Sequence, residues 1–200
     1  MSDPAETLAA SEETRSTTPE PDLRLVEGVA EIDDLDAFLA EIRAISEETG
    51  AVVQAFDADL VVSDTHLVRA TELAARAVAR GEAVARDPAV EVLLYAAGRR
   101  QIDRALAMGV NEGTTPIVVA VADFGAVPNA ARDGEPLVAA DLDAAVEAVQ
   151  ALLRAGDTLS EYDESRVREF FEVTDRELAA TDGDLADVVC ERVALLDVEK

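Results

Sequence analysis

The sequence is 200 residues long and 49% hydrophobic, with 43 acidic residues against 17 basic ones and a formal net charge of −26. Its apolar content excludes a disordered acidic chain, and the lack of any run of about 18 apolar residues excludes a transmembrane helix. The polar, acidic N-terminus is unlike a signal peptide, so we expect a cytoplasmic protein, and the single cysteine excludes an internal disulfide.

Residues 1–22 are rich in Ser, Thr, Glu and Pro, and we expect them to form a disordered acidic tail before a single domain over 23–200. Alternation of apolar and polar residues predicts a first strand over 23–32. An amphipathic helix is predicted over 33–50, with Gly50 at its C-terminal end. Its apolar stripe consists of Leu35, Phe38, Leu39, Ile42 and Ile45.

A second strand is predicted over 51–56, with a continuation at 60–62. Ser63 then has the side chain needed to cap a helix that runs to Arg80 and stops at Gly81. The buried positions expected on this helix are Leu67, Ala70, Ala74, and Ala77 or Val78.

Asp87 and Pro88 predict the start of a helix that is apolar nearly all round, through VEVLLYAA, and should therefore be central. Gly98 interrupts it, and we predict a short second helix over 99–108 that Gly109 ends. Further predictions are a buried strand at 114–124, a loop at 125–136, and helical segments at 141–155, 158–180 and 185–196. This order predicts an α/β (α+β) fold in which helices cover a small central sheet.

Sixteen of the seventeen cations are arginine, and Lys200 is the only lysine. Together with abundant Asp, Ala and Val, this composition is typical of a protein from a salt-rich, halophilic cytoplasm, where surface carboxylates maintain hydration. At molar ionic strength the Debye length is about 3 Å. The overall negative charge therefore does not exclude a nucleic acid as a partner.

Candidate catalytic residues are few. His66 is the single histidine, and no nucleophile motif accompanies it, so we expect a structural role. Cys190 is expected to be a small buried residue on a helix. Acidic pairs carry little information in so acidic a chain, and no phosphate-binding loop, dinucleotide motif or metal-ligand spacing is present. We expect no catalytic site, no metal and no cofactor.

The arginines are unevenly distributed, since seven of the seventeen cations lie between Arg69 and Arg104, with five acids in the same span. Arg69, Arg76 and Arg80 are spaced to share one helix face. Arg99 and Arg100 would begin the predicted 99–108 helix, where they oppose the helix dipole but, beside free backbone N–H groups, would suit a phosphate. The alternative is pairing with surface carboxylates, for instance Glu72 with Arg76, and charge alone does not decide between the two interpretations.

Two segments, DADLVVSDTHLVRATELAARA over 57–77 and EVLLYAAGRRQIDRALAMGV over 91–110, resemble the kinase-binding subunit of the KEOPS complex, the PRPK-binding protein family. The archaeal pattern is similar to LLY, two small residues, G-x-RQI-x-x-A. Here it corresponds to Leu93, Leu94, Tyr95, Ala96, Ala97, Gly98, Arg100, Gln101, Ile102 and Ala105. The resemblance is clearest over 54–121 and extends over 23–197, whereas the acidic tail, the ARDGEP loop at 131–136 and the salt-adapted surface depart from it.

The resemblance implies a small mixed α/β subunit, not an enzyme, in the complex that installs threonylcarbamoyl on the adenosine next to the anticodon of ANN-decoding tRNAs. Such a subunit binds and stimulates the kinase-like ATPase subunit, recruits tRNA by its single-stranded CCA tail, and meets the other KEOPS subunits indirectly. The residues expected at the RNA are Arg69, Arg76, Arg99, Arg100 and Gln101. Those expected at the kinase, each with core burial as the alternative, are Ile102, Leu106, Val193, Leu195 and Leu196.

Two other functions fit the residues. One is a small phosphate-ligand or nucleotide-binding enzyme or sensor that uses Arg99 and Arg100 at the helix N-terminus. The other is a structural scaffold whose arginines form surface ion pairs, each contributing about 0–1 kcal/mol.

Overall fold

The computed structural model describes residues 20–159 and 161–197, so nearly all of the predicted acidic tail lies outside the described residues. Its main sheet has four strands in the order β2-β3-β1-β6, and all of its pairs are antiparallel. Strands β1 (Asp22–Ile32) and β3 (Gly113–Asp123) pair along their whole length. Residues 117–122 of β3 are buried on both faces, as the predicted β-branched run requires.

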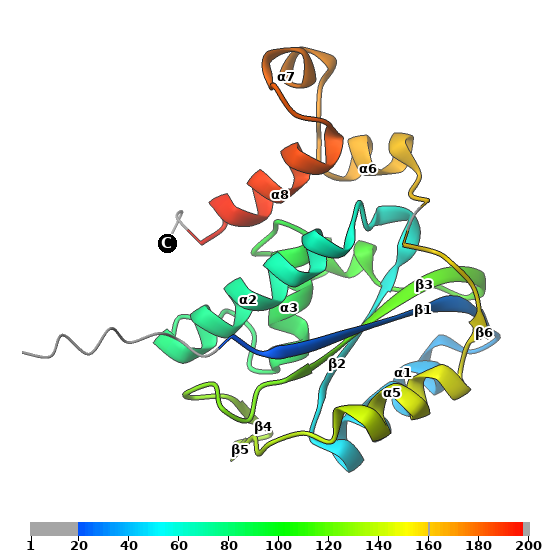
Figure 1. The fold of residues 1–200 in the computed structure, drawn as a ribbon, viewed down its shortest axis with the longest axis vertical. Helices are drawn as coiled ribbons and strands as arrows, with labels where there is room; N and C mark the ends of the chain where they lie inside the picture. The colour runs from blue at the N-terminus through cyan, green and yellow to red at the C-terminus, as the bar shows by residue number, and fades with distance from the viewer. Residues whose placement is uncertain (1–19, 160, 198–200) are drawn as a thin grey trace, which may run out of the picture.

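Helices α1 (Leu35–Thr49) and α5 (Leu142–Ala151) cover one face of the sheet side by side (Figure 1). Gly50 has φ +74° and ends α1 as predicted. Leu39, however, is 45% exposed, so the predicted apolar stripe is too wide. Each helical residue advances by about 100°, which turns Leu39 away from the sheet while Phe38 and Ile42 face it.

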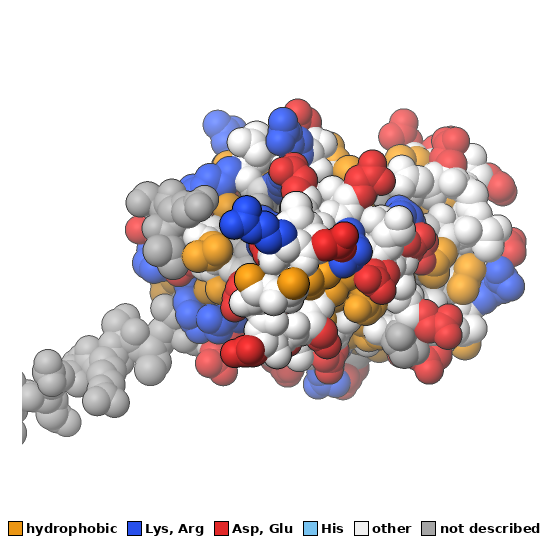
Figure 2. Space-filling view, turned by 90° about the horizontal axis from the view of Figure 1, so that it is seen from above, with side chains coloured by type: hydrophobic (Ala, Val, Ile, Leu, Met, Phe, Trp, Pro, Cys, Tyr) orange, Lys and Arg blue, Asp and Glu red, His pale blue; other side chains and the backbone are white. Residues whose placement is uncertain are grey.

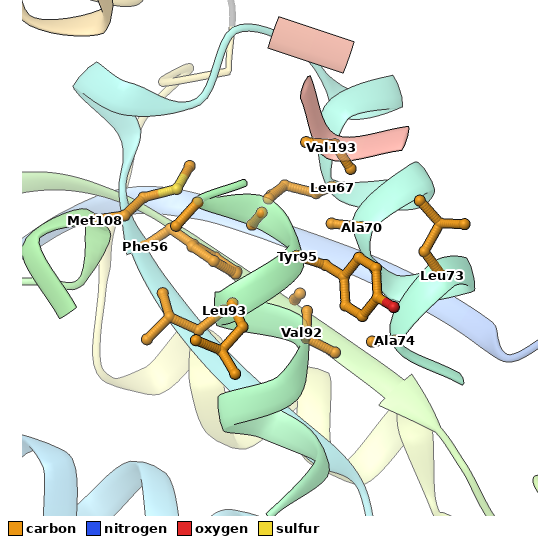
Figure 3. Packing of buried hydrophobic residues seen from close by; sticks show 14 of the residues in the cluster. Phe56, Leu67, Ala70, Leu73, Ala74, Val92, Leu93, Tyr95, Met108 and Val193 are labelled. Carbon is orange, nitrogen blue, oxygen red and sulfur yellow. The ribbon is translucent and has the colours of Figure 1, made fainter. Parts of the chain in front are cut away.

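The opposite face of the sheet is covered by α2 (Asp64–Arg80) and α3 (Pro88–Ala96). Ser63 caps α2 by accepting the N–H of His66 at 3.2 Å, and Gly81 ends it with φ +70°, both as predicted. Helix α3 is buried nearly all round. Figure 3 shows side chains of β2 and α3 packed together, with Tyr95 between α3 and α2.

The C-terminal part of the chain forms a further layer over α2. The single helix predicted at 158–180 is instead two, α6 (Glu164–Phe170) and α7 (Asp175–Ala180), because Glu172 takes the left-handed backbone conformation with φ +57°. Helix α8 (Leu185–Leu195) packs on α2, whereas α7 stands away and has no buried residue (Figure 1).

Several shorter elements differ from the sequence prediction. Strand β2 (Val52–Asp57) is not continued at 60–62, because the 3-10 turn η1 (Ala58–Leu60) follows it. The predicted 125–136 loop contains a small hairpin of β4 (Ala131–Arg132) and β5 (Glu135–Pro136). The predicted 141–155 helix ends at Ala151, and β6 (Arg154–Ala155) joins the sheet. Within residues 20–159 and 161–197, no helix combines the length and apolar character that a membrane span needs.

Gly28 of β1 permits the close approach of β6. A Cβ at Gly28 would lie 2.6 Å from the backbone oxygen of Arg154, whereas a Cβ at Gly156 would have its nearest neighbour at 3.5 Å. We therefore expect Gly28→Ala to lower the free energy of unfolding by about 1–3 kcal/mol through overpacking. Gly156→Ala is the matched control and should have little effect. Denaturant unfolding at constant high salt measures both, and equal stabilities would contradict this account of the β1–β6 contact.

Candidate functional site around the Gly98 turn

The quoted segment 91–110 forms α3, a turn at Gly98, the short helix α4 (Ile102–Ala105) and the 3-10 turn η2 (Leu106–Met108). Gly98 has φ +58°, and its N–H donates to Tyr95 O at 2.9 Å. The N–H of Arg99 donates to Leu94 O at 3.0 Å. These are the two hydrogen bonds of a Schellman motif, which closes a helix at its C-terminal end.

Arg99 and Arg100 therefore follow the C-terminus of α3. The predicted short helix over 99–108 is present and ends before Gly109, but it begins at Ile102, so its predicted start at Arg99 is wrong. The N–H of Arg99 is used inside the protein, and α4 has only four residues, so the predicted phosphate site at a helix N-terminus is not formed. The carbonyl end of a helix carries negative partial charge, where a cation contributes about 0.3–1 kcal/mol. The two arginines thus interact favourably with the dipole of α3, whereas the sequence predicted that they would oppose the dipole of a following helix.

The Arg99 side chain attaches the turn to the end of α6. Its Nη2 donates to the backbone oxygen of Phe170, and its Nη1 lies 3.3 Å from Oε1 of Glu172. The guanidinium also lies 5.5 Å from the centre of the Phe170 ring, in cation–π range. Only 20% of the Arg99 side chain is exposed. Arg99 is therefore mainly committed to contacts within the protein.

The end of α8 is held by donors from three other parts of the chain. Arg100 donates from Nη2 to Leu196 O at 3.0 Å. One carboxylate oxygen of Asp197 accepts from Arg80 Nη2 at 2.6 Å and from the Tyr95 hydroxyl at 3.2 Å. Burial and the charge of Asp197 raise the pKa of Tyr95, so its hydroxyl remains a donor.

His66 has the structural role that the sequence predicted. Its ring is fully buried, with Nε2 2.8 Å from Ala96 O and the ring of Phe171 edge-on at 5.9 Å. A carbonyl oxygen only accepts, so Nε2 carries the proton. Burial lowers the pKa of His66 to about 4, which keeps the ring neutral. His66 thereby links the start of α2 to the last turn of α3.

Two buried carboxylates were not predicted. Glu91 is 1% exposed and accepts the N–H groups of Val84 and Ala85 at 2.9 and 2.8 Å, which fixes the loop between α2 and α3. Asp57 is 3% exposed and pairs with Arg166 at 2.6 Å, which ties α6 to the end of β2. An acidic residue inside an otherwise apolar run could have indicated that Glu91 and Asp57 are buried. The many other acidic residues in the chain obscured this signal.

The residues predicted to bind RNA differ in exposure. Arg69 and Arg76 lie 3.6 and 3.9 Å from the same carboxylate oxygen of Glu72, so the predicted alternative of surface pairing is observed. Their side chains are nevertheless 43% and 38% exposed, and Gln101 is also exposed. On the face of the molecule that Figure 2 shows, cationic side chains gather toward one end and acidic ones toward the other.

The residues predicted to bind the kinase divide into two groups. Ile102, Leu106 and Leu195 are 43%, 58% and 54% exposed. Val193 and Leu196 are buried in the core, at 0% and 8%, and so do not belong to an exposed patch. Val193 on α8 and Leu196 directly after it lie three residues apart and face the core, whereas Leu195 points away from it.

Cys190 is half-buried where full burial was predicted, and burial raises the pKa of its thiol. Over residues 20–159 and 161–197, no group of three or more His, Cys, Asp or Glu side chains is placed to hold a metal ion.

Exposed aliphatic side chains and partly exposed arginines are residue types that interfaces with other macromolecules use. The family model described as kinase binding protein CGI-121 matches residues 30–197, and the chain belongs to this family. No curated protein matches the sequence. The predicted resemblance to the kinase-binding subunit of KEOPS is thereby confirmed at the level of the family.

The buried ring of His66 makes stability depend on pH. In the unfolded chain its pKa is near 6.5, and in the folded protein it is about 4, so the unfolded state binds the proton first as the pH falls. The associated stability is complete above pH 6.5 and is lost progressively towards pH 4. At pH 5 the loss is about 2 kcal/mol.

Denaturant unfolding of wild type and His66→Gln from pH 7 to pH 5 measures this loss. The glutamine amide retains a donor for Ala96 O but does not titrate, so the difference between the two curves excludes the carboxylates that both proteins share. The stability of wild type should fall more steeply. Parallel curves would show that His66 does not titrate as its burial requires.

Proposed function

We propose that this chain is the non-catalytic accessory subunit of a KEOPS complex in tRNA threonylcarbamoyladenosine biosynthesis. In this role it binds and stimulates the kinase-like ATPase subunit and recruits tRNA through its single-stranded CCA tail. The observation that carries the proposal is membership of a kinase-binding family over residues 30–197. Contact with the remaining KEOPS subunits would be indirect, through the kinase.

The surface that we assign to the kinase consists of Ile102, Leu106 and Leu195. Exposed aliphatic side chains form the water-excluding centres of protein interfaces. The hydrogen bond from Arg100 to Leu196 O keeps the end of α8 against the turn from which α4 begins. The three side chains thus belong to neighbouring elements, which supports one shared docking surface.

The surface that we assign to RNA consists of Arg69 and Arg76 on α2, and Arg100 and Gln101 after the Gly98 turn. Single-stranded RNA is held by cations on its phosphates, by apolar or planar groups under its bases, and by hydrogen bonds to base edges. Arg99 is mostly covered, so we assign it the role of positioning this turn through Phe170 O.

The alternative of a phosphate-ligand enzyme or sensor required Arg99 and Arg100 at the N-terminus of a helix. That geometry is absent, since both residues follow the end of α3 and the Arg99 N–H is already bonded to Leu94 O. This alternative therefore loses its supporting feature.

The kinase assignment predicts that Leu106→Asp weakens binding to the kinase-like ATPase subunit by roughly tenfold or more, because a charge would be buried at the centre of the interface. Leu39→Asp is the matched control, since Leu39 is similarly exposed but lies on α1. Calorimetric titration of the two purified subunits measures affinity, and circular dichroism checks the fold. If both variants bind like wild type, or lose affinity equally, the assigned surface is wrong.

The RNA assignment predicts that binding requires the CCA tail and is weakened by Arg76→Glu and by Gln101→Glu. Each has a control with the same charge change on an exposed residue elsewhere: Arg154→Glu on β6 and Gln150→Glu on α5. The assigned variants should lose roughly tenfold in affinity because phosphate contacts are replaced by repulsion.

Filter binding or fluorescence anisotropy with intact and tail-less tRNA, at several salt concentrations, measures this loss. Binding that is indifferent to the tail would contradict recruitment through CCA. A loss that is equal in assigned and control variants would show that only net charge matters.

A further inference from the structure

Two donors from different helices converge on one oxygen atom of Asp197. Arg80 Nη2 of α2 lies 2.6 Å from Asp197 Oδ1, and the hydroxyl of Tyr95 of α3 lies 3.2 Å from the same atom. One residue earlier, Leu196 O accepts from Arg100 at 3.0 Å. A guanidinium and a hydroxyl aimed at one anionic oxygen, with a second guanidinium beside them, form a pattern that also suits a phosphate group.

Asp197 and its neighbour Leu196 contact residues adjacent to both sets that we assign to RNA. Arg80 is one helical turn beyond Arg76 on the same face of α2. Arg100, which holds the neighbouring residue Leu196, directly precedes Gln101. A strand that contacted both Arg76 and Gln101 would thus come close to the residues that hold Asp197 and Leu196.

The group that fills this site lies in the turn after α8 and not within a long element. Helix α8 ends at Leu195, and the following turn is held by hydrogen bonds from Leu196 N to Arg192 O and from Asp197 N to Ala194 O, at 3.3 and 3.2 Å. Last turns of helices open more readily than their centres. Of the two residues in the turn, only Leu196 is counted in the buried core.

We propose that Arg80, Tyr95 and Arg100 form a phosphate-binding site for single-stranded RNA, and that the last turn of α8 occupies it with the Asp197 carboxylate until RNA displaces it. This inference rests on the proposed RNA-binding function and adds Arg80 and Tyr95 to its residues. Asp197 competes with the phosphate for the same donors. Glu82, whose carboxylate lies 3.2 Å from Arg80 Nε, remains in place when the turn moves.

The test compares wild type with Asp197→Asn, which keeps the shape of the side chain and removes its charge. The control is Glu191→Gln, an exposed position on α8 with the same charge change. The probe is a short single-stranded RNA ending in CCA, measured by fluorescence anisotropy. We expect Asp197→Asn to bind roughly tenfold more tightly, because a charged competitor is gone, and the control to change by less than about twofold.

A second variant tests the donors themselves. Adding Tyr95→Phe to Asp197→Asn should remove part of the gain, because the hydroxyl then no longer reaches the phosphate. If Asp197→Asn unfolds, a chain that ends at Leu195 replaces it and should show the same gain.

The outcomes separate this inference from the proposed function. If wild type and Asp197→Asn bind the RNA with equal measurable affinity, the competing role of Asp197 is overturned and RNA binding stands. If neither binds, the RNA-binding function itself fails. A gain for inorganic phosphate in calorimetry, without a gain for the RNA, would overturn the assignment to RNA.

Discussion

The positive φ of Gly98 determines where the chain leaves α3, and the attachment of the C-terminal helices depends on that exit. The N–H groups of Gly98 and Arg99 donate to the carbonyls of Tyr95 and Leu94. The side chains of Arg99 and Arg100 therefore lie beside the ends of α6 and α8. Any residue with a Cβ would be strained at this backbone conformation. One small residue thus allows Arg99 and Arg100 to reach acceptors that lie 71 and 96 residues further along the chain.

The C-terminal layer is held by polar contacts at its ends as well as by its apolar face. Arg166 reaches Asp57 and Asp59 at 2.6 Å each, and Asp57 is buried. Breaking such a pair leaves a buried charge without a partner, which is strongly unfavourable. Surface pairs are weakened by salt, whereas buried pairs are screened much less. At high ionic strength these partly buried contacts would therefore keep more of their strength than exposed pairs.

Local signals in the sequence were sufficient for the elements that begin and end with strong caps. Ser63 and Gly81 bound α2, and Asp87 with Pro88 begins α3, because capping depends on residues within one helical turn. The division of 158–180 was not predictable, since Glu172 adopts a left-handed conformation without a glycine or proline to indicate it. The predicted position of Arg99 and Arg100 at the start of a helix was also wrong. A glycine can interrupt a helix that continues or end it, and the local sequence does not distinguish the two. Only the distant carbonyls of Phe170 and Leu196 distinguish the two cases.

The kinds of acceptor used around the turn explain how so acidic a chain can still present positive charge. Arg100 is held by the carbonyl of Leu196, which fixes the guanidinium without neutralising it. Arg69 and Arg76 share the single carboxylate of Glu72, so the group of three keeps a net positive charge. Arg80, in contrast, meets carboxylates of both Glu82 and Asp197. At high ionic strength charges attract each other only when they are nearly in contact. An arginine that a neutral acceptor holds in place therefore contributes more to binding an anionic partner than long-range attraction does.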